Sequence, residues 1–160
     1  MTPAVDVHLA VAEDALQIAA MSRTLIEHDL PWTWQPARVR NAIHSPITNV
    51  AVAREGGNLI AFGIMEYLDE DAYLVLFAVQ ERRQRQGVGS AVLRWLEESA
   101  IAAGSSRIRV DARRDNGPAR MFYNERGYHE VRISARKYSG QVDQVRLEKW
   151  LRPALPKSDA

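Results

Sequence analysis

The sequence predicts an α/β domain with a mixed β-sheet, and three observations lead to that prediction. The chain has 160 residues, of which 46% are hydrophobic and 26% charged, as in an ordinary globular domain. Short strand patterns alternate along it with longer patterns of helical period. No internal repeat, low-complexity tract or linker divides it. We therefore expect one domain over residues 1–152 and a frayed tail over residues 153–160.

The first third of the chain predicts one strand and two helices. Residues 5–10 form a short strand pattern, and Glu13 and Asp14 stand where acidic side chains favour the start of a helix. Residues 30–35 (LPWTWQ) form an aromatic loop, and Pro36 can begin a second short helix that runs to about residue 44. The first helix has a core-facing stripe formed by Ala15, Ile18, Ala19, Ser22 and Ile26.

The middle third predicts three strands and a helix. Two strand patterns, residues 47–54 and 59–67, flank the turn Glu55-Gly56-Gly57-Asn58, which predicts a hairpin. Residues 72–79 are apolar at every position, so we expect a central strand that is buried on both faces. A glycine-containing turn and then a helix follow, and the helix ends at Gly104. Its core-facing positions are Val88, Ala91, Val92, Trp95 and Leu96.

The last third predicts a strand, a helix and an antiparallel pair of strands. Residues 107–111 are a strand pattern, and Asn116-Gly117-Pro118 starts a helix that runs to Arg126. Gly127 follows it, at the position where a left-handed residue is favoured. Residues 128–138 and 141–150 complete the chain as two strands. The predicted order is β-α-α-β-β-β-α-β-α-β-β, which is typical of a mixed-sheet α/β domain.

Composition and charge exclude several classes of protein. The formal net charge of +1 gives no global field of the kind that attracts nucleic acid. The chain has no cysteine, which removes disulfides, thiolate nucleophiles and cysteine-bound zinc. The N-terminal residues lack the pattern of a secretory signal, and the longest apolar run is too short to span a bilayer. From these features we expect no membrane contact and a cytoplasmic location. The four histidines show no metal-ligand spacing, so we also expect no bound metal.

The turn before the long helix carries the clearest functional pattern. It reads Gln84-x-x-Gly87-x-Gly89 between a strand and a helix. Amides at the start of a helix have no partner within the helix and can bind phosphate groups. A nucleotide-binding P-loop would need Lys-Ser or Lys-Thr after the last glycine, but Ser-Ala stands there. A dinucleotide fingerprint would need a glycine at Val92 and strictly alternating strands and helices, which the preceding hairpin contradicts.

This pattern resembles the motif Arg/Gln-x-x-Gly-x-Gly/Ala, with which the GNAT family of N-acyltransferases binds acyl-CoA. A second stretch, from Asn116 through Ala119 and Tyr123 to Gly127, resembles the family's Asn-x-x-Ala-x-x-Leu-Tyr-x-x-x-Gly-Phe. The two motifs stand in family order and spacing, and the resemblance spans nearly the whole chain. It implies a mostly antiparallel sheet flanked by helices, with acetyl-CoA as the co-substrate.

The resemblance also implies which residues hold acetyl-CoA. They are Phe77, Ala78 and Val79 at the end of the central strand, Gln84, Arg85, Gln86, Gly87, Val88, Gly89 and Ser90 in the turn, and Asn116 and Tyr123 in the second motif. Three arginines could also meet phosphate groups, namely Arg82, Arg83 and Arg85. A solvated charged loop is the alternative, and we expect it to hold for at least one of the three.

Within the family, the resemblance is greatest to RimI-type enzymes, which acetylate the N-terminal amine of a ribosomal protein. The matching segments are residues 31–32, 70–72, 78–79, 85–89, 111–116 and 136–138. Asp111, Ser139 and Leu76 depart from that type, in which glutamate, tyrosine and asparagine stand. The resemblance implies a protein or peptide N-terminal α-amine as the acceptor. Trp32, Trp34 and Tyr138 are candidate walls of its site, and a satellite hydrophobic cluster is the alternative for the two tryptophans.

Acetyl transfer to an amine needs a proton for the departing thiolate and a base for the amine. Tyr123 keeps its proton at neutral pH and can serve as the acid. Spacing alone favours a core aromatic there, and the family resemblance favours the catalytic role.

Asp111 ends a strand and can serve as the base, directly or through water, if its surroundings make it more basic. A salt bridge with Arg109 or Arg113 is the alternative. Three other carboxylates compete for the role, namely Glu66, Glu70 and Asp71.

Three other functions compete with this one. An acetyltransferase for a small-molecule amine, such as an amino acid, polyamine or antibiotic, would use the same fold. A catalytically silent acyl-CoA-binding module would not need Tyr123 and Asn116, which are both present. Nucleic-acid binding through Arg107, Arg109, Arg113 and Arg114 would lack an aromatic stacking platform, because Arg107, Arg109 and Asp111 share one strand face. The acceptor and the oligomeric state do not follow from the sequence.

Overall fold

The computed structural model describes residues 5–135 and 143–151 of the chain. Its strands are β1 (Asp6–Leu9), β2 (Thr48–Glu55), β3 (Asn58–Leu68), β4 (Asp71–Val79), β5 (Arg107–Arg113), β6 (His129–Ser134) and β7 (Gln144–Trp150). Its helices are α1 (Ala15–Leu25), α2 (Pro36–His44), α3 (Val88–Ala102) and α4 (Gly117–Glu125). Short 3-10 helices, η1 (Ala12–Asp14) and η2 (Glu81–Arg83), are added to the predicted order.

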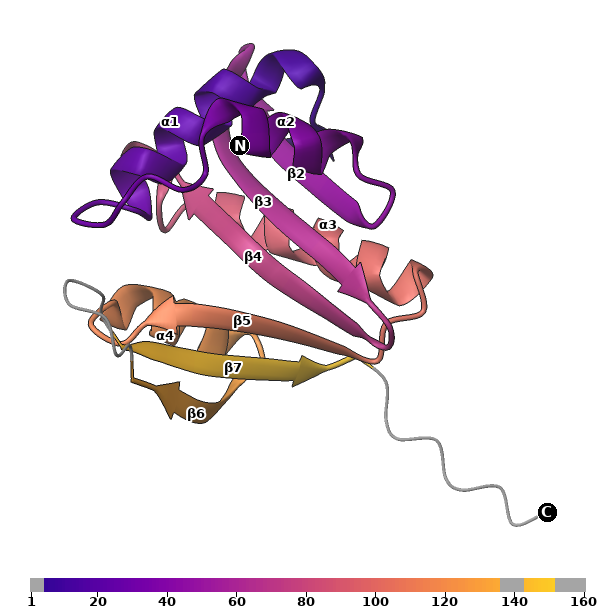
Figure 1. The fold of residues 1–160 in the computed structure, drawn as a ribbon, viewed down its shortest axis with the longest axis vertical. Helices are drawn as coiled ribbons and strands as arrows, with labels where there is room; N and C mark the ends of the chain where they lie inside the picture. The colour runs from indigo at the N-terminus through magenta and orange to yellow at the C-terminus, as the bar shows by residue number, and fades with distance from the viewer. Residues whose placement is uncertain (1–4, 136–142, 152–160) are drawn as a thin grey trace. The chain divides into compact units, whose positions relative to one another are not determined.

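The strands are hydrogen-bonded in the order β1-β2-β3-β4-β5-β7-β6 (Figure 1). The pairs β1–β2, β2–β3, β5–β7 and β6–β7 are antiparallel. The predicted class, an α/β fold with a mostly antiparallel sheet and flanking helices, is therefore confirmed. By their contacts the residues group into two compact units, unit 1 within residues 1–66 and 74–99 and unit 2 within residues 67–73 and 100–160. The single domain expected over residues 1–152 stays a prediction.

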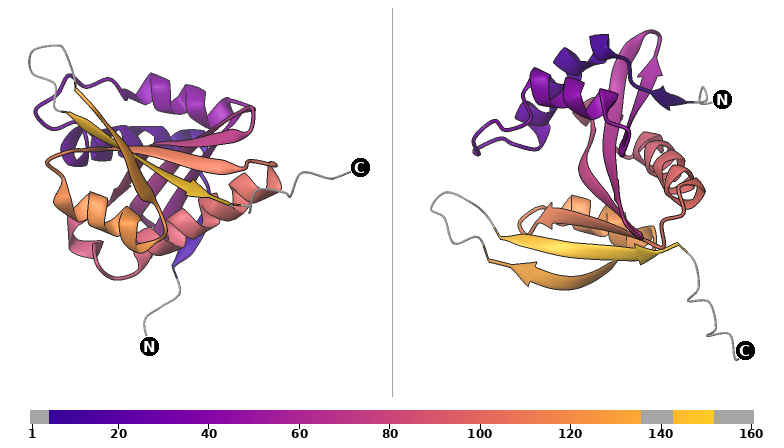
Figure 2. Two further views of the ribbon diagram at one scale, coloured as in Figure 1. Left: turned by 90° about the horizontal axis from the view of Figure 1, so that it is seen from below. Right: turned by 45° about the vertical axis from the view of Figure 1, so that its right-hand side comes forward.

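In unit 1 the strands are covered on both faces. Helices α1 and α2 lie over one face of β2, β3 and β4, and α3 lies over the other (Figure 2). The first face carries a cluster of buried side chains that includes Ile18 of α1, Val39 of α2 and Phe62 of β3. This double covering explains why seven consecutive residues of β3 are buried, since side chains of a strand point alternately to its two faces.

Gly63 of β3 lets α3 approach the strands closely. A Cβ at this position would lie 2.6 Å from Cδ1 of Leu96 and 3.3 Å from Cδ2 of Phe77. Leu96 is fully buried, so a larger residue would displace well-packed core atoms. The missing side chain of Gly63 therefore sets the packing distance between β3 and the helix that follows the glycine turn.

The prediction that β4 is buried on both faces is wrong for one of them. Buried and half-buried positions alternate along the strand, and Ala72, Leu74, Leu76 and Ala78 are the buried ones. The intervening side chains, among them Phe77 and Val79, retain partial exposure. An apolar run cannot distinguish full burial of both faces from full burial of one and partial cover of the other.

In unit 2 the strands have one apolar and one charged face. The apolar face includes Ile108 and Val110 of β5 and Leu147 of β7, which are buried together with Tyr123 and Tyr128 from α4 and the residues after it. The opposite face presents Arg107 and Arg109 at the positions between them, as their alternation along the strand predicts. The sequence predicted strands over 128–138 and 141–150, whereas β6 ends at Ser134 and β7 begins at Gln144. Residues 136–138 and 141–142 of the two predicted strands lie outside the described part.

Candidate functional site

The turn between β4 and α3 bends through two residues with left-handed backbone conformations. Arg85 has a φ of 65° and Gly87 a φ of 84°. The first helical hydrogen bond runs from the Ala91 amide to the Gly87 carbonyl oxygen, at 3.1 Å. The amides that precede this bond have no acceptor within an α-helix and lie at the positive end of its dipole. The predicted strand–turn–helix arrangement is present.

The space around this turn suits an anionic ligand. Gly87 is exposed, and a Cβ built on it would meet no atom within 4 Å. Glycine is therefore required here by the backbone conformation and leaves the amides open to approach. Gly89 and Ser90 are half-buried in the first turn of α3, whereas the Val88 side chain is buried in the core. Contact of these residues with the pyrophosphate of coenzyme A stays a prediction.

The three arginines before the helix have different roles. Arg83 forms an ion pair with Glu55 at the end of β2, and its Nη1 donates to Oε1 of Gln86 at 3.2 Å. Arg83 is therefore engaged within the protein, and the expectation that at least one of the three arginines stays in a solvated charged loop remains a prediction. Arg82 and Arg85 are exposed, and no side-chain partner is assigned to either guanidinium in the described structure. They are the candidates for phosphate contact.

Two predicted ligand residues stabilise the turn through their side chains. Nε2 of Gln84 donates to the Val79 carbonyl oxygen at 3.1 Å, and Nε2 of Gln86 donates to the Arg82 carbonyl oxygen at 3.3 Å. Each bond closes a loop of four or five residues over the segment that joins β4 to α3. One amide hydrogen of each side chain is therefore engaged within the turn, and contact of Gln84 and Gln86 with acetyl-CoA stays a prediction.

In unit 2, Tyr123 lies near the end of α4 in an apolar setting. It is 5% exposed, and its ring meets those of Phe122 and Tyr128 edge-on, at centroid distances of 5.3 and 5.5 Å. Burial raises the pKa of the Tyr123 hydroxyl well above its ordinary value of 10, because a phenolate is poorly solvated there. The side chain therefore holds its proton throughout the neutral range, as an acid group must.

Asn116 begins α4. Its Oδ1 accepts a hydrogen bond from the Ala119 amide at 3.1 Å, and Pro118 occupies one of the first two helical positions. Both features favour a helix start, because the first amides of a helix lack internal partners and proline needs none. The structure thus gives Asn116 a capping role, and its contact with acetyl-CoA stays a prediction.

Asp111 is paired with a residue that sequence reasoning did not consider. Its two carboxylate oxygens accept hydrogen bonds from Nε and Nη2 of Arg146, at 2.9 and 3.1 Å. Arg146 stands directly opposite Asp111 in the β5–β7 register. The expected partners are engaged elsewhere, since Arg109 pairs with Glu148 at 2.8 Å and Arg113 with Asp115 at 3.2 Å. A salt bridge at Asp111 was foreseen, but its partner was wrong.

The two tryptophans lie in a loop that one buried carboxylate holds. Glu27 is 7% exposed, and its oxygens accept hydrogen bonds from the Thr33 amide at 2.7 Å, the Thr33 hydroxyl at 2.6 Å and the Trp34 amide at 3.2 Å. Trp34 is buried in the core cluster of unit 1, and Trp32 is half-buried, with Nε1 donating to the Ala19 carbonyl oxygen at 3.2 Å.

These contacts favour the satellite-cluster alternative for Trp34. Trp32 keeps an exposed portion and can still border an acceptor. Tyr138, the third candidate wall, lies outside the described residues. Sequence reasoning missed Glu27, because a glutamate just after a helix carries no periodic signal, and only the fold brings Thr33 and Trp34 back to it.

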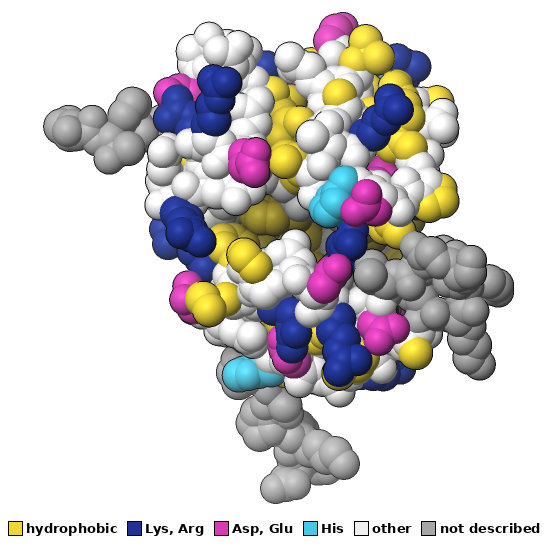
Figure 3. Space-filling view, turned by 90° about the vertical axis from the view of Figure 1, so that its left-hand side faces the viewer, with side chains coloured by type: hydrophobic (Ala, Val, Ile, Leu, Met, Phe, Trp, Pro, Cys, Tyr) yellow, Lys and Arg dark blue, Asp and Glu magenta, His cyan; other side chains and the backbone are white. Residues whose placement is uncertain are grey.

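The arginines considered for nucleic-acid binding are engaged in ion pairs within unit 2. Arg107 pairs with Asp71 at 2.9 Å and Arg114 with Asp143 at 3.3 Å, beside the pairs of Arg109 and Arg113. On the face of the molecule in Figure 3, basic and acidic side chains are interspersed. A continuous basic surface, which phosphate backbones require, is not what these residues form.

Comparison with known proteins identifies the family. Residues 19–128, more than half of the chain, match the model of the acetyltransferase (GNAT) family. The chain belongs to the GNAT family. The ribosomal protein bS18-alanine N-acetyltransferase of Escherichia coli is 30% identical to it over 94 residues, which are 57% of this chain and 64% of that enzyme. The chain thus matches less than two thirds of the length of this curated relative.

Solved structures share the GNAT fold of the chain. Ard1 from Thermoplasma volcanium superposes with a TM-score of 0.81 at 20% identity, over 94% of this chain and 99% of that one. PaiA N-acetyltransferase from Thermoplasma acidophilum, solved in complex with coenzyme A, superposes with a TM-score of 0.74 at 15% identity, over 92% and 99% of the two chains. At such identities the similarity establishes the fold.

Two kinds of feature are absent from the described residues, 5–135 and 143–151. Among their helices, none is long and apolar enough to cross a membrane. Within the same residues, no group of three or more His, Cys, Asp or Glu side chains is arranged so that it could hold a metal ion.

Proposed function

We propose that this GNAT protein transfers the acetyl group of acetyl-CoA to a primary amine. The observation that carries the proposal is the turn between β4 and α3, where two left-handed residues precede an open helix start. A backbone of this shape binds pyrophosphate through amides. The family match over residues 19–128 and the coenzyme A bound to one structural relative support the same ligand.

The binding roles follow from the geometry of the turn. The amides at the start of α3 donate hydrogen bonds to the pyrophosphate, and Arg85 and Arg82 add positive charge beside it. Arg83 takes no part in phosphate contact, because Glu55 already neutralises it. Phe77, Ala78 and Val79, at the end of β4, border the pantetheine arm, as the family resemblance implies.

The reaction exchanges one bond for another. The amine nitrogen forms a bond to the carbonyl carbon of the acetyl group, the carbon–sulfur bond breaks, and the nitrogen releases a proton while the sulfur takes one up. An ordinary thiol has a pKa of about 8.5, below that of the buried Tyr123. Complete proton transfer from Tyr123 is therefore uphill. Its hydroxyl donates a hydrogen bond that stabilises the developing thiolate. The amine releases one proton and the sulfur finally takes up one, so the reaction neither consumes nor produces protons overall.

Asp111 is proposed to receive the amine. A carboxylate has about four lone-pair positions, and the guanidinium of Arg146 takes two of them. The other two can accept hydrogen bonds from the incoming amine or from a water that carries its proton away. Asp111 is part-exposed, so water reaches this carboxylate.

The acceptor is proposed to be the α-amine of a protein or peptide N-terminus. A free α-amine has a pKa near 8 and a lysine amine one near 10.4, so the neutral form of lysine costs roughly 3 kcal/mol more to reach at neutral pH. A site whose base is a part-exposed carboxylate should favour the α-amine, which needs less energy to deprotonate. The name of the E. coli relative, an alanine N-acetyltransferase that acts on a ribosomal protein, supports the same class of acceptor.

A peptide with both kinds of amine tests this proposal. It begins with alanine, contains one internal lysine, and is incubated with acetyl-CoA and the protein. Thiol release reports turnover, and fragmentation mass spectrometry locates the acetyl group. Acetylation at the N-terminus is expected. The matched control is the same peptide with a blocked N-terminus, which should release no thiol. Acetylation mainly at lysine would overturn the proposed acceptor, and absence of turnover with peptides and free amines alike would overturn the proposed activity.

A further inference from the structure

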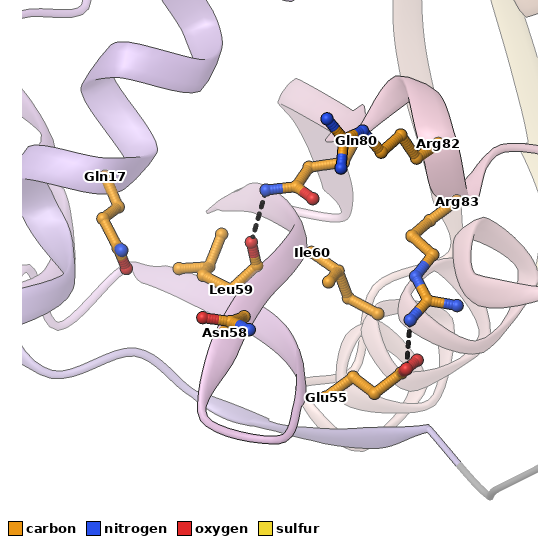
Figure 4. A pocket seen from close by; sticks show the side chains of 8 residues that line it. All are labelled: Gln17, Glu55, Asn58, Leu59, Ile60, Gln80, Arg82 and Arg83. Atoms are coloured by element: carbon orange, nitrogen blue, oxygen red, sulfur yellow. Dashed lines mark hydrogen bonds and ion pairs between the residues drawn. The ribbon is translucent and has the colours of Figure 1, made fainter.

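We propose that Glu55 and Arg83 position the coenzyme A-binding turn, although neither touches the ligand. Glu55, the last residue of β2, forms an ion pair with Arg83 of η2 (Figure 4). Arg83 in turn donates a hydrogen bond to Gln86 inside the turn. The inference rests on the proposed function, because it concerns acetyl-CoA binding. It adds two positioning residues that lie outside the glycine motif.

Both ends of the Arg83 guanidinium are used. Nη2 pairs with the Glu55 carboxylate, and Nη1 donates to Oε1 of Gln86 at 3.2 Å. Gln86 in turn donates from Nε2 to the Arg82 carbonyl oxygen at 3.3 Å. Gln86 directly precedes Gly87, whose left-handed backbone opens the helix start. A side chain at the end of β2 is thereby connected to the residue before the phosphate-binding amides.

The beginning of the segment is anchored separately, by uncharged hydrogen bonds. The Gln80 amide donates to the Ile60 carbonyl oxygen at 2.8 Å, and its Nε2 donates to the Leu59 carbonyl oxygen at 2.9 Å (Figure 4). These bonds fix the exit from β4 against β3. They lie six residues before Gln86, so the far part of the turn needs its own support. The Glu55–Arg83–Gln86 chain provides that support.

Packing contributes little to this support. No residue of η2 is buried. Beside it lies a hollow of about 430 Å³, lined by Glu55, Asn58, Gln80, Arg82 and Arg83 among others. Where open space adjoins a segment, apolar side chains cannot fix its position, and directional polar contacts must do so. The Glu55 and Arg83 side chains are 40% and 34% exposed, so their ion pair adds little to the stability of the whole fold. Its effect is expected on the position of the turn.

The variant E55Q separates positioning from charge. Removal of one negative charge beside a basic turn should by electrostatics alone strengthen the binding of the polyanionic coenzyme A. A positioning role predicts the opposite result, because an uncharged amide at position 55 holds Arg83 more weakly than the carboxylate does, and the support of Gln86 is weakened with it. We expect the Kd for coenzyme A, measured by titration calorimetry at low salt, to rise at least threefold. The KM for acetyl-CoA should rise with it, while kcat is nearly unchanged.

A second variant, R83K, leaves every formal charge in place. Lysine can pair with Glu55 but lacks the planar fork that reaches two partners at once. Positioning predicts weaker coenzyme A binding for R83K, and a purely electrostatic role predicts no change. The matched control is E130Q, which removes another part-exposed Arg–Glu pair, Arg120–Glu130, from unit 2. E130Q should bind coenzyme A as the wild type does, and all three variants should melt within about 4 °C of it.

The outcomes distinguish the inference from the function on which it rests. If the wild-type chain binds coenzyme A and E55Q binds it equally or more tightly, the positioning role is overturned and the proposed function stands. If the wild-type chain does not bind coenzyme A, the proposed function falls and the inference with it. Weaker binding by E55Q and R83K, with E130Q unchanged, supports the positioning role.

Discussion

Arg85 and Gly87 determine the path of the backbone into α3. Arg85 is one of three described non-glycine residues with positive φ, and the other two, Asp29 and Asp69, are aspartates. Aspartate tolerates the left-handed region through local hydrogen bonds, whereas arginine does so at a cost of roughly 1–2 kcal/mol. Backbone strain of this kind persists where the surrounding structure enforces it, often at a binding site. Here it occurs next to the amides that we assign to the pyrophosphate.

Gly87→Val should weaken acetyl-CoA binding at least tenfold, which is about 1.4 kcal/mol. Valine would strain a backbone with a φ of 84° and would place methyl groups in the space through which a phosphate approaches. Calorimetry measures the affinity. Gly104→Val is the matched control, because Gly104 also has a positive φ, 90°, and a Cβ added to it would meet no atom within 4 Å. Equal losses of affinity in the two variants would mean that strain, not access, is responsible.

Tyr123→Phe should lower kcat on the order of a hundredfold and leave the affinity for acetyl-CoA unchanged. The substitution keeps the ring, with its edge-on contacts to Phe122 and Tyr128, and removes only the proton donor. Steady-state kinetics with thiol detection measures both quantities. Tyr128→Phe, which removes the hydroxyl of a neighbouring buried ring, is the control and should turn over normally. Turnover of Tyr123→Phe within twofold of the wild type would assign Tyr123 a structural role.

The sequence indicated candidate residues of the site, but it did not indicate the partners that hold their side chains. The glycines of the turn and Tyr123 belong to short motifs, so local spacing is enough to find them. Arg146 lies 35 positions from Asp111, and Arg83 lies 28 positions from Glu55. Such pairs depend on strand register and on the return of the chain, which no local pattern encodes. Candidate site residues could therefore be named where a motif exists, whereas their ion-pair partners could not.

At the scale of elements, a segment with a strong periodic pattern of apolar residues forms the helix that the pattern predicts. The long helix after the turn has its predicted start and buries Val88, Val92 and Leu96, because an amphipathic stripe must face a core. The two 3-10 helices, of three residues each, are too short for any period to be seen. The loop between α1 and α2 is held by hydrogen bonds to a single carboxylate, that of Glu27. A single residue likewise shows no periodicity in the sequence.

Glu27→Gln should destabilise the protein by about 1–3 kcal/mol at neutral pH, because an amide cannot accept all the hydrogen bonds that the carboxylate accepts. Burial acts to raise the pKa of Glu27, but hydrogen bonds from Thr33, Ser22 and Trp34 outweigh it, and the pKa lies below its ordinary value of 4.5. A lowered folded pKa contributes stability that is present above the unfolded pKa and lost as pH falls through the folded one.

The destabilisation by Glu27→Gln should therefore shrink as the pH falls below about 4.5. Urea unfolding of wild type and variant at neutral pH and at acid pH measures the difference. Glu70→Gln, at an exposed position between β3 and β4, is the control and should leave stability unchanged at either pH. A difference between wild type and Glu27→Gln that stays constant with pH would show that the ionised carboxylate does not stabilise the loop.

At the scale of the whole molecule, single elements contribute residues to both units. In β4, residues 71–73 belong to unit 2 and residues 74–79 to unit 1, and α3 divides likewise after residue 99. One strand and one helix are therefore each continuous across the two units. The sequence suggested one domain because no linker separates these parts, and continuity of the elements is the physical reason to expect cooperativity.

Thermal unfolding should therefore be a single two-state transition, with calorimetric and van't Hoff enthalpies that agree. For 160 residues the enthalpy should be roughly 110 kcal/mol near 60 °C.

The tryptophans provide a sharper test, because Trp32, Trp34 and Trp95 belong to unit 1 and Trp150 to unit 2. In Trp150→Phe, fluorescence reports on unit 1 alone, while far-UV circular dichroism reports on both units. The two curves should coincide, since loss of either unit disrupts β4 and α3. A fluorescence transition that is displaced from the dichroism transition would show that the units unfold separately and that the prediction of one domain is wrong.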